Sequence, residues 1–166
     1  MDSNTTSTNA DFITKQVLNA WNIQINVVDK ILNLLTDEQL LAEVATNRNS
    51  GVYLLGHLTA VHDALHPLLG FGDKLHPHLE SIFIKNPDKS GLAKPTMKEL
   101  RTFWTEVNNS LFHHFIKCTT EDWLQKHTAI SDEAFTKEPQ RNKLAVVLNR
   151  TSHLAYHAGQ LVFLKT

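Results

Sequence analysis

Residues 152–160 read Ser152-His153-Leu154-Ala155-Tyr156-His157-Ala158-Gly159-Gln160, and this stretch decides how the fold is interpreted, because it places two histidines in an otherwise apolar helix. A spacing of four residues brings both imidazoles onto one face of an α-helix, about one turn apart. A single metal ion can then take one nitrogen from each ring. Because two ligands hold a metal poorly, we expect a third ligand from another helix.

Length and composition limit the classes of protein to which the chain can belong. Its 166 residues are enough for one domain with a compact core. We expect a disordered tail over residues 1–10 and a single domain over residues 11–166. With 16 basic and 17 acidic side chains the net charge is -1, which predicts neither a nucleic acid nor an anionic membrane as partner.

The sequence also indicates where the protein resides. The single cysteine, Cys118, permits no internal disulfide, which suits a reducing compartment. Residues 1–11 are polar and lack the basic start and apolar stretch of a signal peptide. No run reaches the roughly 20 apolar residues that a membrane span requires. We therefore predict a cytoplasmic protein.

Four long segments have apolar residues three to five positions apart, which is the period of a helix and not of a strand. They cover residues 11–35, 50–69, 96–115 and 139–164. In the second segment Pro67 should disturb the helix near its end. The third begins with a capping-box pattern at Thr96 and Glu99. The fourth begins near Pro139 or Gln140.

Two long connections separate these helices. Residues 70–94 contain proline dipeptides and a short apolar piece, residues 79–84, that fits one helical turn. This connection crosses the end of a bundle or forms a lid. Residues 118–139 show no clear period. The pattern predicts an all-α fold, a four-helix bundle with long crossover connections.

The third ligand should lie on a helix that faces the last one. His57 is the best candidate, because apolar neighbours and about two turns of helix on each side place it in the middle of the second segment. The alternative is that His57 is a hydrogen-bonded histidine of the core, which is the commoner fate of a lone histidine on an apolar helix. Its combination with His153 and His157 favours the metal site.

A rival pair, His62 and His66, has the same spacing of four residues. These residues lie about 140° and 180° around the helix from His57, so they cannot join it at one site. Pro67 also disfavours helical geometry at His66. If His57 faces the core, the pair faces outward, and we interpret both as surface residues. We expect solvated side chains at the other five histidines, which are His76, His78, His113, His114 and His127.

The residues around these histidines resemble a known family. Gly56-His57-Leu58, followed by the segment His153–Gln160, is similar to the DinB-like superfamily, including its YfiT-like members. The resemblance spans nearly the whole chain in helix order. It implies a DinB/YfiT-like four-helix bundle, commonly a homodimer, in which three histidines bind a divalent metal ion, most often zinc or nickel. The ligands carried over are His57, His153 and His157.

Three neutral imidazoles leave a tetrahedral ion with one open position, which is the arrangement of a catalytic site. Leu154 stands where a zinc protease would have its general-base glutamate, so proteolysis by that mechanism is disfavoured. Asn149 and Gln160 share the face of the paired histidines and can orient them or a substrate. Tyr53, one turn before His57, lines the site or fills the core.

The resemblance implies an enzyme that transfers a low-molecular-weight thiol, such as bacillithiol or mycothiol, to a small electrophile. One alternative is a metal-dependent hydrolase that uses metal-bound hydroxide. Another is a non-catalytic metal- or ligand-binding module for sensing or stress protection. Three imidazoles suit zinc, nickel, iron and cobalt similarly, so the residues alone do not select the metal.

The expected homodimer also has physical support in apolar side chains that one bundle leaves uncovered. Trp104 and Phe112 are the two residues that we expect to be exposed in this way. The alternative is a monomer whose long loops cover them.

Overall fold

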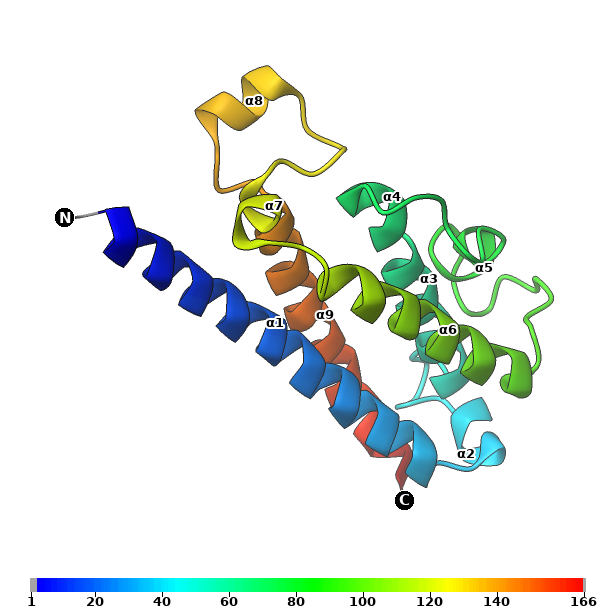
Figure 1. Ribbon diagram of the computed structural model, residues 1–166. Coiled ribbons are helices and arrows are strands. Elements are labelled where there is room, and N and C mark those ends of the chain that lie inside the picture. Colours follow the sequence, from blue (N-terminus) through cyan, green and yellow to red (C-terminus); the bar gives the residue numbers. More distant parts are fainter. Residues whose placement is uncertain (1–2, 166) are drawn as a thin grey trace.

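The computed structural model of the protein describes residues 3–165 (Figure 1). Its four long helices are α1 (Ser3–Leu34), α3 (Gly51–Asp63), α6 (Met97–Phe115) and α9 (Lys143–Leu161). Helix α1 packs against α9, and α3 packs against both α6 and α9. Between residues 3 and 165 there is no β-strand, and each of the two isolated β-bridges only closes a loop. The predicted all-α bundle is confirmed.

Six short helices accompany the long ones, five in the connections between them and one after α9. They are α2 (Asp37–Leu41), α4 (Leu65–Leu69), α5 (Leu79–Phe83), α7 (Thr120–Leu124), α8 (Asp132–Lys137) and the 3-10 helix η1 (Val162–Lys165). The helical turn predicted over residues 79–84 is α5. Helices α7 and α8 form in the segment that showed no clear period.

Helix α1 starts earlier than predicted. It begins at Ser3 and not near Asp11, so residues 3–10, which we expected in a disordered tail, are helical. Adding a residue to an existing helix costs far less than starting one, because each added residue gains a hydrogen bond without a new nucleus. This end of α1 extends beyond the rest of the bundle (Figure 1).

The second predicted segment is divided into α3 and α4 by Pro67. Proline has no N–H, so it cannot donate to the carbonyl of Asp63 four residues earlier. That carbonyl instead accepts a hydrogen bond from His66 Nδ1 at 3.1 Å. The chain bends at Ala64 as a result.

Side-chain caps fix where α6 and α9 begin. The predicted capping box is present, with Thr96 Oγ1 accepting from Glu99 N and the Glu99 carboxylate accepting from Thr96 N. Helix α9 begins at Lys143, after the predicted start near Pro139, because Asn142 Oδ1 accepts from Ala145 N at 2.9 Å.

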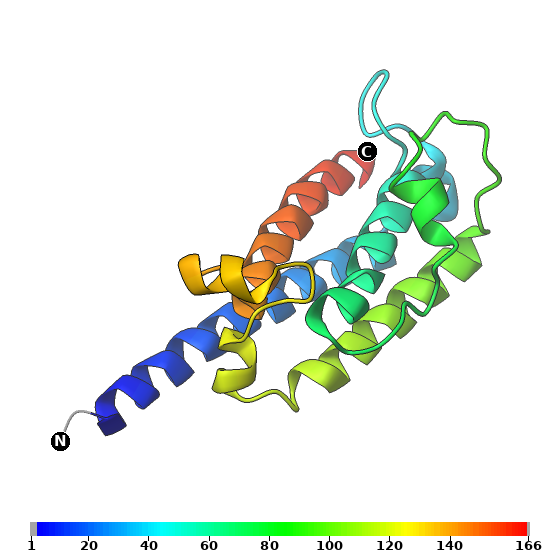
Figure 2. The ribbon, with the colours of Figure 1, turned by 90° about the horizontal axis from the view of Figure 1, so that it is seen from above.

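Helix α3 lies in the centre of the molecule, between α6 and α9, with α5 against another side (Figure 2). Every residue of α3 is buried except His57, which is half-buried. Gly56 lets α5 come close, since a Cβ on this glycine would lie 2.3 Å from the ring of Phe83. The chain therefore needs glycine immediately before His57.

One expected surface residue is in the core. Trp104, which we predicted to be exposed, is 3% exposed, because its indole packs beside His62 and donates Nε1–H to Asp29 Oδ1 at 2.7 Å. A polar partner on α1 thus satisfies the one donor of the indole and lets the ring be buried. Phe112 is exposed as predicted. None of the helices described here is long and apolar enough to cross a membrane.

Candidate metal centre

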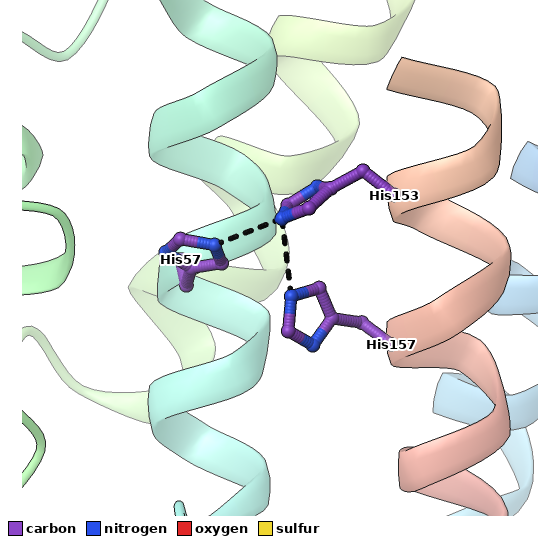
Figure 3. A group of neighbouring side chains, drawn as sticks. All are labelled: His57, His153 and His157. Atoms are coloured by element: carbon purple, nitrogen blue, oxygen red, sulfur yellow. Dashed lines mark hydrogen bonds between the residues drawn. The ribbon is translucent and has the colours of Figure 1, made fainter. Parts of the chain in front are cut away.

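Three histidines from two helices point toward one another between α3 and α9 (Figure 3). His57 comes from α3, and His153 and His157 come from successive turns of α9. We call them the histidine triad. The Nε2 atom of His153 lies 3.2 Å from His57 Nε2 and 3.1 Å from His157 Nε2. All three rings are half-buried, so the cluster remains open to a ligand from solvent.

Hydrogen bonds decide which nitrogen of each ring can bind a cation. His57 Nδ1–H donates to the carbonyl of Phe83 at 2.8 Å, and His157 Nδ1–H donates to Gln160 Oε1 at 2.7 Å. In a neutral imidazole one nitrogen carries the proton and the other has a free lone pair. The lone pairs of both rings therefore lie on Nε2 and point into the triad.

A metal ion would satisfy the three Nε2 atoms better than they satisfy one another. His153 Nε2 carries one proton at most, so it can donate to only one of the two neighbouring Nε2 atoms. At least two nitrogens therefore face each other with no hydrogen between them. Imidazole nitrogens that bind zinc at about 2.0–2.1 Å in a tetrahedron lie about 3.3 Å apart. The measured separations of 3.1 and 3.2 Å are close to that value. The triad can hold a divalent metal ion, although its distances do not select which one.

Burial keeps two of the three imidazoles, those of His153 and His157, in the neutral form that can bind a metal ion. Burial lowers the pKa of His153 to about 4, with smaller contributions from His157, His57 and the charge of Arg150. Burial also lowers the pKa of His157, while its hydrogen bond to Gln160 acts in the opposite direction and raises that pKa. A lowered pKa favours neutral imidazole, so both rings offer lone pairs at pH 7.

The three expected supporting residues differ in their positions. Gln160 orients His157 directly, and its Nε2 donates to the hydroxyl of Tyr156 at 3.3 Å. Tyr53 stacks on His57 with ring centroids 6.3 Å apart, while its hydroxyl donates to the carbonyl of Asn86 at 2.8 Å.

Asn149 does not support the triad. Its side chain is exposed and has no hydrogen bond to any of the three rings. It therefore orients no imidazole in this structure, and its expected role toward a substrate stays a prediction.

The rival pair is not on the surface, contrary to the prediction. His62, on α3, is 0% exposed, and His66, on α4, is 2% exposed, because the helices packed around them bury both side chains. His62 packs beside Trp21 and Trp104, and its Nδ1–H donates to Asn108 Oδ1 at 2.8 Å. Burial lowers its pKa to about 3.

His66 belongs to a second buried network. Its Nδ1 faces both the carbonyl and the carboxylate of Asp63, and its Nε2 accepts from Ser110 Oγ at 2.9 Å. The carboxylate of Asp63 also accepts from the backbone N–H groups of Leu75 and His76. The order Ser, His, Asp matches a hydrolase triad, but Ser110 lies inside α6, where the helix occupies the backbone donors that an oxyanion hole needs. We interpret the network as structural.

The remaining histidines form no comparable group in the part of the chain that the structure describes, where the triad is the one set of three possible ligands found. His78 and His113 are exposed, as predicted. The other three are half-buried, and His76 Nε2 lies 3.0 Å from Glu106 Oε2.

Two features near the site were not predicted from the sequence. The first is the carbonyl of Phe83, a backbone group that leaves no trace in the sequence, although Gly56 could have signalled that another element approaches α3 closely. The second is Arg150, which lies three residues before His153 on the same face of α9. That spacing was a usable signal.

Comparison with known proteins agrees with this geometry. A family model described as the DinB superfamily matches residues 20–161 of the chain, a range that contains the whole triad. The comparison with curated proteins finds no match.

Proposed function

The chain belongs to the DinB superfamily, and from that premise we propose that it is a metal-dependent enzyme whose ion is held by His57, His153 and His157. The observation that carries the proposal is the pair of Nε2 lone pairs, on His57 and His157, directed at one point. Zinc and nickel are the metals that the family resemblance favours. The proposed enzyme is cytoplasmic and acts on a small molecule.

The specific reaction that we propose is transfer of a low-molecular-weight thiol to a small electrophile. A divalent ion in such a site lowers the pKa of a bound thiol or water and so supplies a nucleophile near neutral pH. The chain's own part is to hold the ligands in place. Phe83 and Gln160 fix two imidazoles, and the half-buried rings leave an approach for the substrate. Cys118, whose thiol donates to the carbonyl of His114 in the turn after α6, need take no part, because the cosubstrate supplies the thiol.

Two other functions compete with this proposal. A hydrolase would use the same ion and ligands, and analysis of the products distinguishes it, since a transferase yields a thioether where a hydrolase yields an acid or alcohol. A non-catalytic module would be favoured by a site sealed with large apolar side chains. The partial exposure of all three rings supports the enzyme over that module.

Metal content tests the first part of the proposal. Untagged wild-type protein should retain about one divalent ion per chain in elemental analysis, and His57→Ala should lose it because two imidazoles bind far more weakly than three. His113→Ala is the matched control, since this exposed histidine of α6 belongs to no cluster. Equal metal content in His57→Ala and wild type would remove His57 from the site.

Thiol consumption tests the second part. The metal-loaded wild type should consume a small thiol, such as bacillithiol, in the presence of monochlorobimane, and His57→Ala should do so at the uncatalysed rate. A protein that holds its metal but consumes no thiol with any electrophile of a broad panel contradicts thiol transfer and leaves the metal site intact.

We also propose that the chain forms a homodimer, as the family resemblance implies. Trp104 no longer supports this, whereas Phe112, which is 46% exposed, still does. Light scattering of the purified protein gives the molar mass directly.

A further inference from the structure

Arg150 lies on the same stripe of α9 as the triad. Residues spaced three and four apart share a helix face, and the series Arg150, His153, His157 and Gln160 follows that spacing. The last three members carry or orient the candidate ligands.

This arginine has no partner in the described part of the chain. It forms no ion pair or hydrogen bond there, and its Nε is buried without an acceptor. Burial lowers its pKa, which is the mark of a cation that has lost water and gained no counter-charge. A half-buried, uncompensated charge costs stability, so packing gives no reason to keep it.

Arg150 lines a hollow of about 280 Å³ beside the N-terminal half of α9. Arg141 and His127 also line this hollow, and none of its lining residues is acidic. Arg141 already pairs with Glu138 at 3.0 Å, so Arg150 is the cation that remains free there among the described residues. Leu68 and Val146 supply apolar walls. The hollow therefore combines a positive charge, a small volume and apolar walls, and Arg150, which lines it, lies about one helical turn from His153.

These observations specify the chemistry of a ligand. A guanidinium presents parallel N–H groups that match the two oxygens of a carboxylate or phosphate. Such an anion would satisfy the buried Nε and neutralise the charge in one step. We propose that Arg150 binds the anionic group of a small carboxylate or phosphate substrate and places the rest of that molecule toward the triad. This inference rests on the proposed function, because it names the substrate class of the same site.

Nuclear magnetic resonance of the arginine side chains tests the proposal. Succinate is the probe and the uncharged succinamide is its control, at an ionic strength held constant with NaCl. Succinate should shift the Nε–H signal of Arg150, which is identified by its loss in Arg150→Lys. Backbone signals of α9 then give the affinity in each variant. We expect Arg150→Gln to lose at least tenfold, Arg150→Lys to lose several-fold, and Arg48→Gln, an exposed arginine in the loop before α3, to match wild type.

The fold of the variants is checked separately. Arg150→Met removes the unpaired charge and keeps an unbranched chain, so its melting temperature should equal or exceed that of wild type while succinate affinity falls. An Arg150→Met protein that melts lower and still binds succinate as wild type does would show that the arginine is structural, and it would overturn the proposal.

The measurement is made with and without one equivalent of zinc, which separates the two proposals. If zinc binds the triad but Arg150→Gln binds succinate as well as wild type, the anion site is wrong and the metal centre stands. If zinc does not bind but succinate affinity still depends on Arg150, the metal centre is wrong and the anion site stands. Equal affinities for succinate and succinamide would also overturn the anion site.

Discussion

At the scale of single residues, the triad is held unevenly. His57 and His157 each have one nitrogen committed to a neighbour, so their rings have little freedom to turn. Such outer hydrogen bonds orient metal ligands and are worth about 10–100-fold in metal affinity. His153 has no such bond, since its buried Nδ1 lacks a partner in the described structure. His153 is therefore the ligand with the least fixed ring, although it lies between the other two.

A residue-scale prediction concerns His62 and the pH dependence of stability. Burial lowers its pKa to about 3, from an ordinary value of 6.5 in the unfolded chain. The unfolded state then binds the proton more tightly, so stability that is fully present above pH 6.5 is lost as the pH falls from 6.5 toward 3. The loss is about 1.4 kcal/mol per pH unit for this one group.

Urea denaturation of the metal-free protein between pH 4 and 8 measures this slope. His62→Leu should have a slope that is shallower by that amount, whereas His113→Leu, at an exposed position, should keep the slope of wild type. Equal slopes in His62→Leu and wild type would show that His62 does not stay neutral in the folded protein.

At the scale of elements, the close contact of α3 with α5 sets the geometry of the site. Gly56 lets the ring of Phe83 lie against α3, and the carbonyl of the same Phe83 then accepts from His57. One residue without a side chain thus positions its neighbour through an element 26 residues farther along the chain. The motif Gly56-His57 is a single structural unit.

The corresponding prediction is that Gly56→Ala weakens both the fold and the site. The added methyl group would meet Phe83 at 2.3 Å, so α5 must move. We expect a loss of about 1–3 kcal/mol in the free energy of unfolding and weaker metal binding, measured by urea denaturation and metal titration. Gly159→Ala is the control, because its Cβ has open space and a helix gains about 0.5–1 kcal/mol from this change. Unchanged metal affinity in Gly56→Ala would separate the glycine from the site.

The elements also show what the sequence could and could not predict. The helical period of the apolar residues predicted the four long helices, and the capping-box pattern at Thr96 predicted where α6 begins. The triad followed from spacing and family resemblance. The burial of His62 and His66 did not follow, because the apolar period assumes a helix with one solvent-exposed face, whereas α3 is buried at every position except His57, and His66 lies beyond it in the buried start of α4. Trp104 was misplaced because its partner, Asp29, lies 75 residues away in the sequence.

At the scale of the molecule, the triad joins helices that are far apart in the chain. His57 and His153 are separated by 96 residues, so an ion held by both would link the second and the last long helices. A ligand that binds only the folded state stabilises it by about 2.7 kcal/mol at one hundred times its dissociation constant. Metal binding should therefore stabilise the whole bundle.

Thermal unfolding tests this expectation. Zinc at that concentration should raise the melting temperature by roughly 5–10 °C for a domain of this size, and a chelator should reverse the rise. His113→Ala should respond like wild type and His57→Ala should not respond. A rise of equal size in His57→Ala would place the ion elsewhere.

Helix α3 touches neighbours on every side, and this has a consequence for how the sequence can drift over generations. A change at nearly any of its positions needs a matching change on α5, α6 or α9, whereas the outer faces of α1 and α8 are free to vary alone. Accepted mutations should therefore accumulate at the periphery, and nearly all of residues 51–63 should stay unchanged among relatives. In an ordinary surface helix, by contrast, only about every third or fourth residue is constrained in this way.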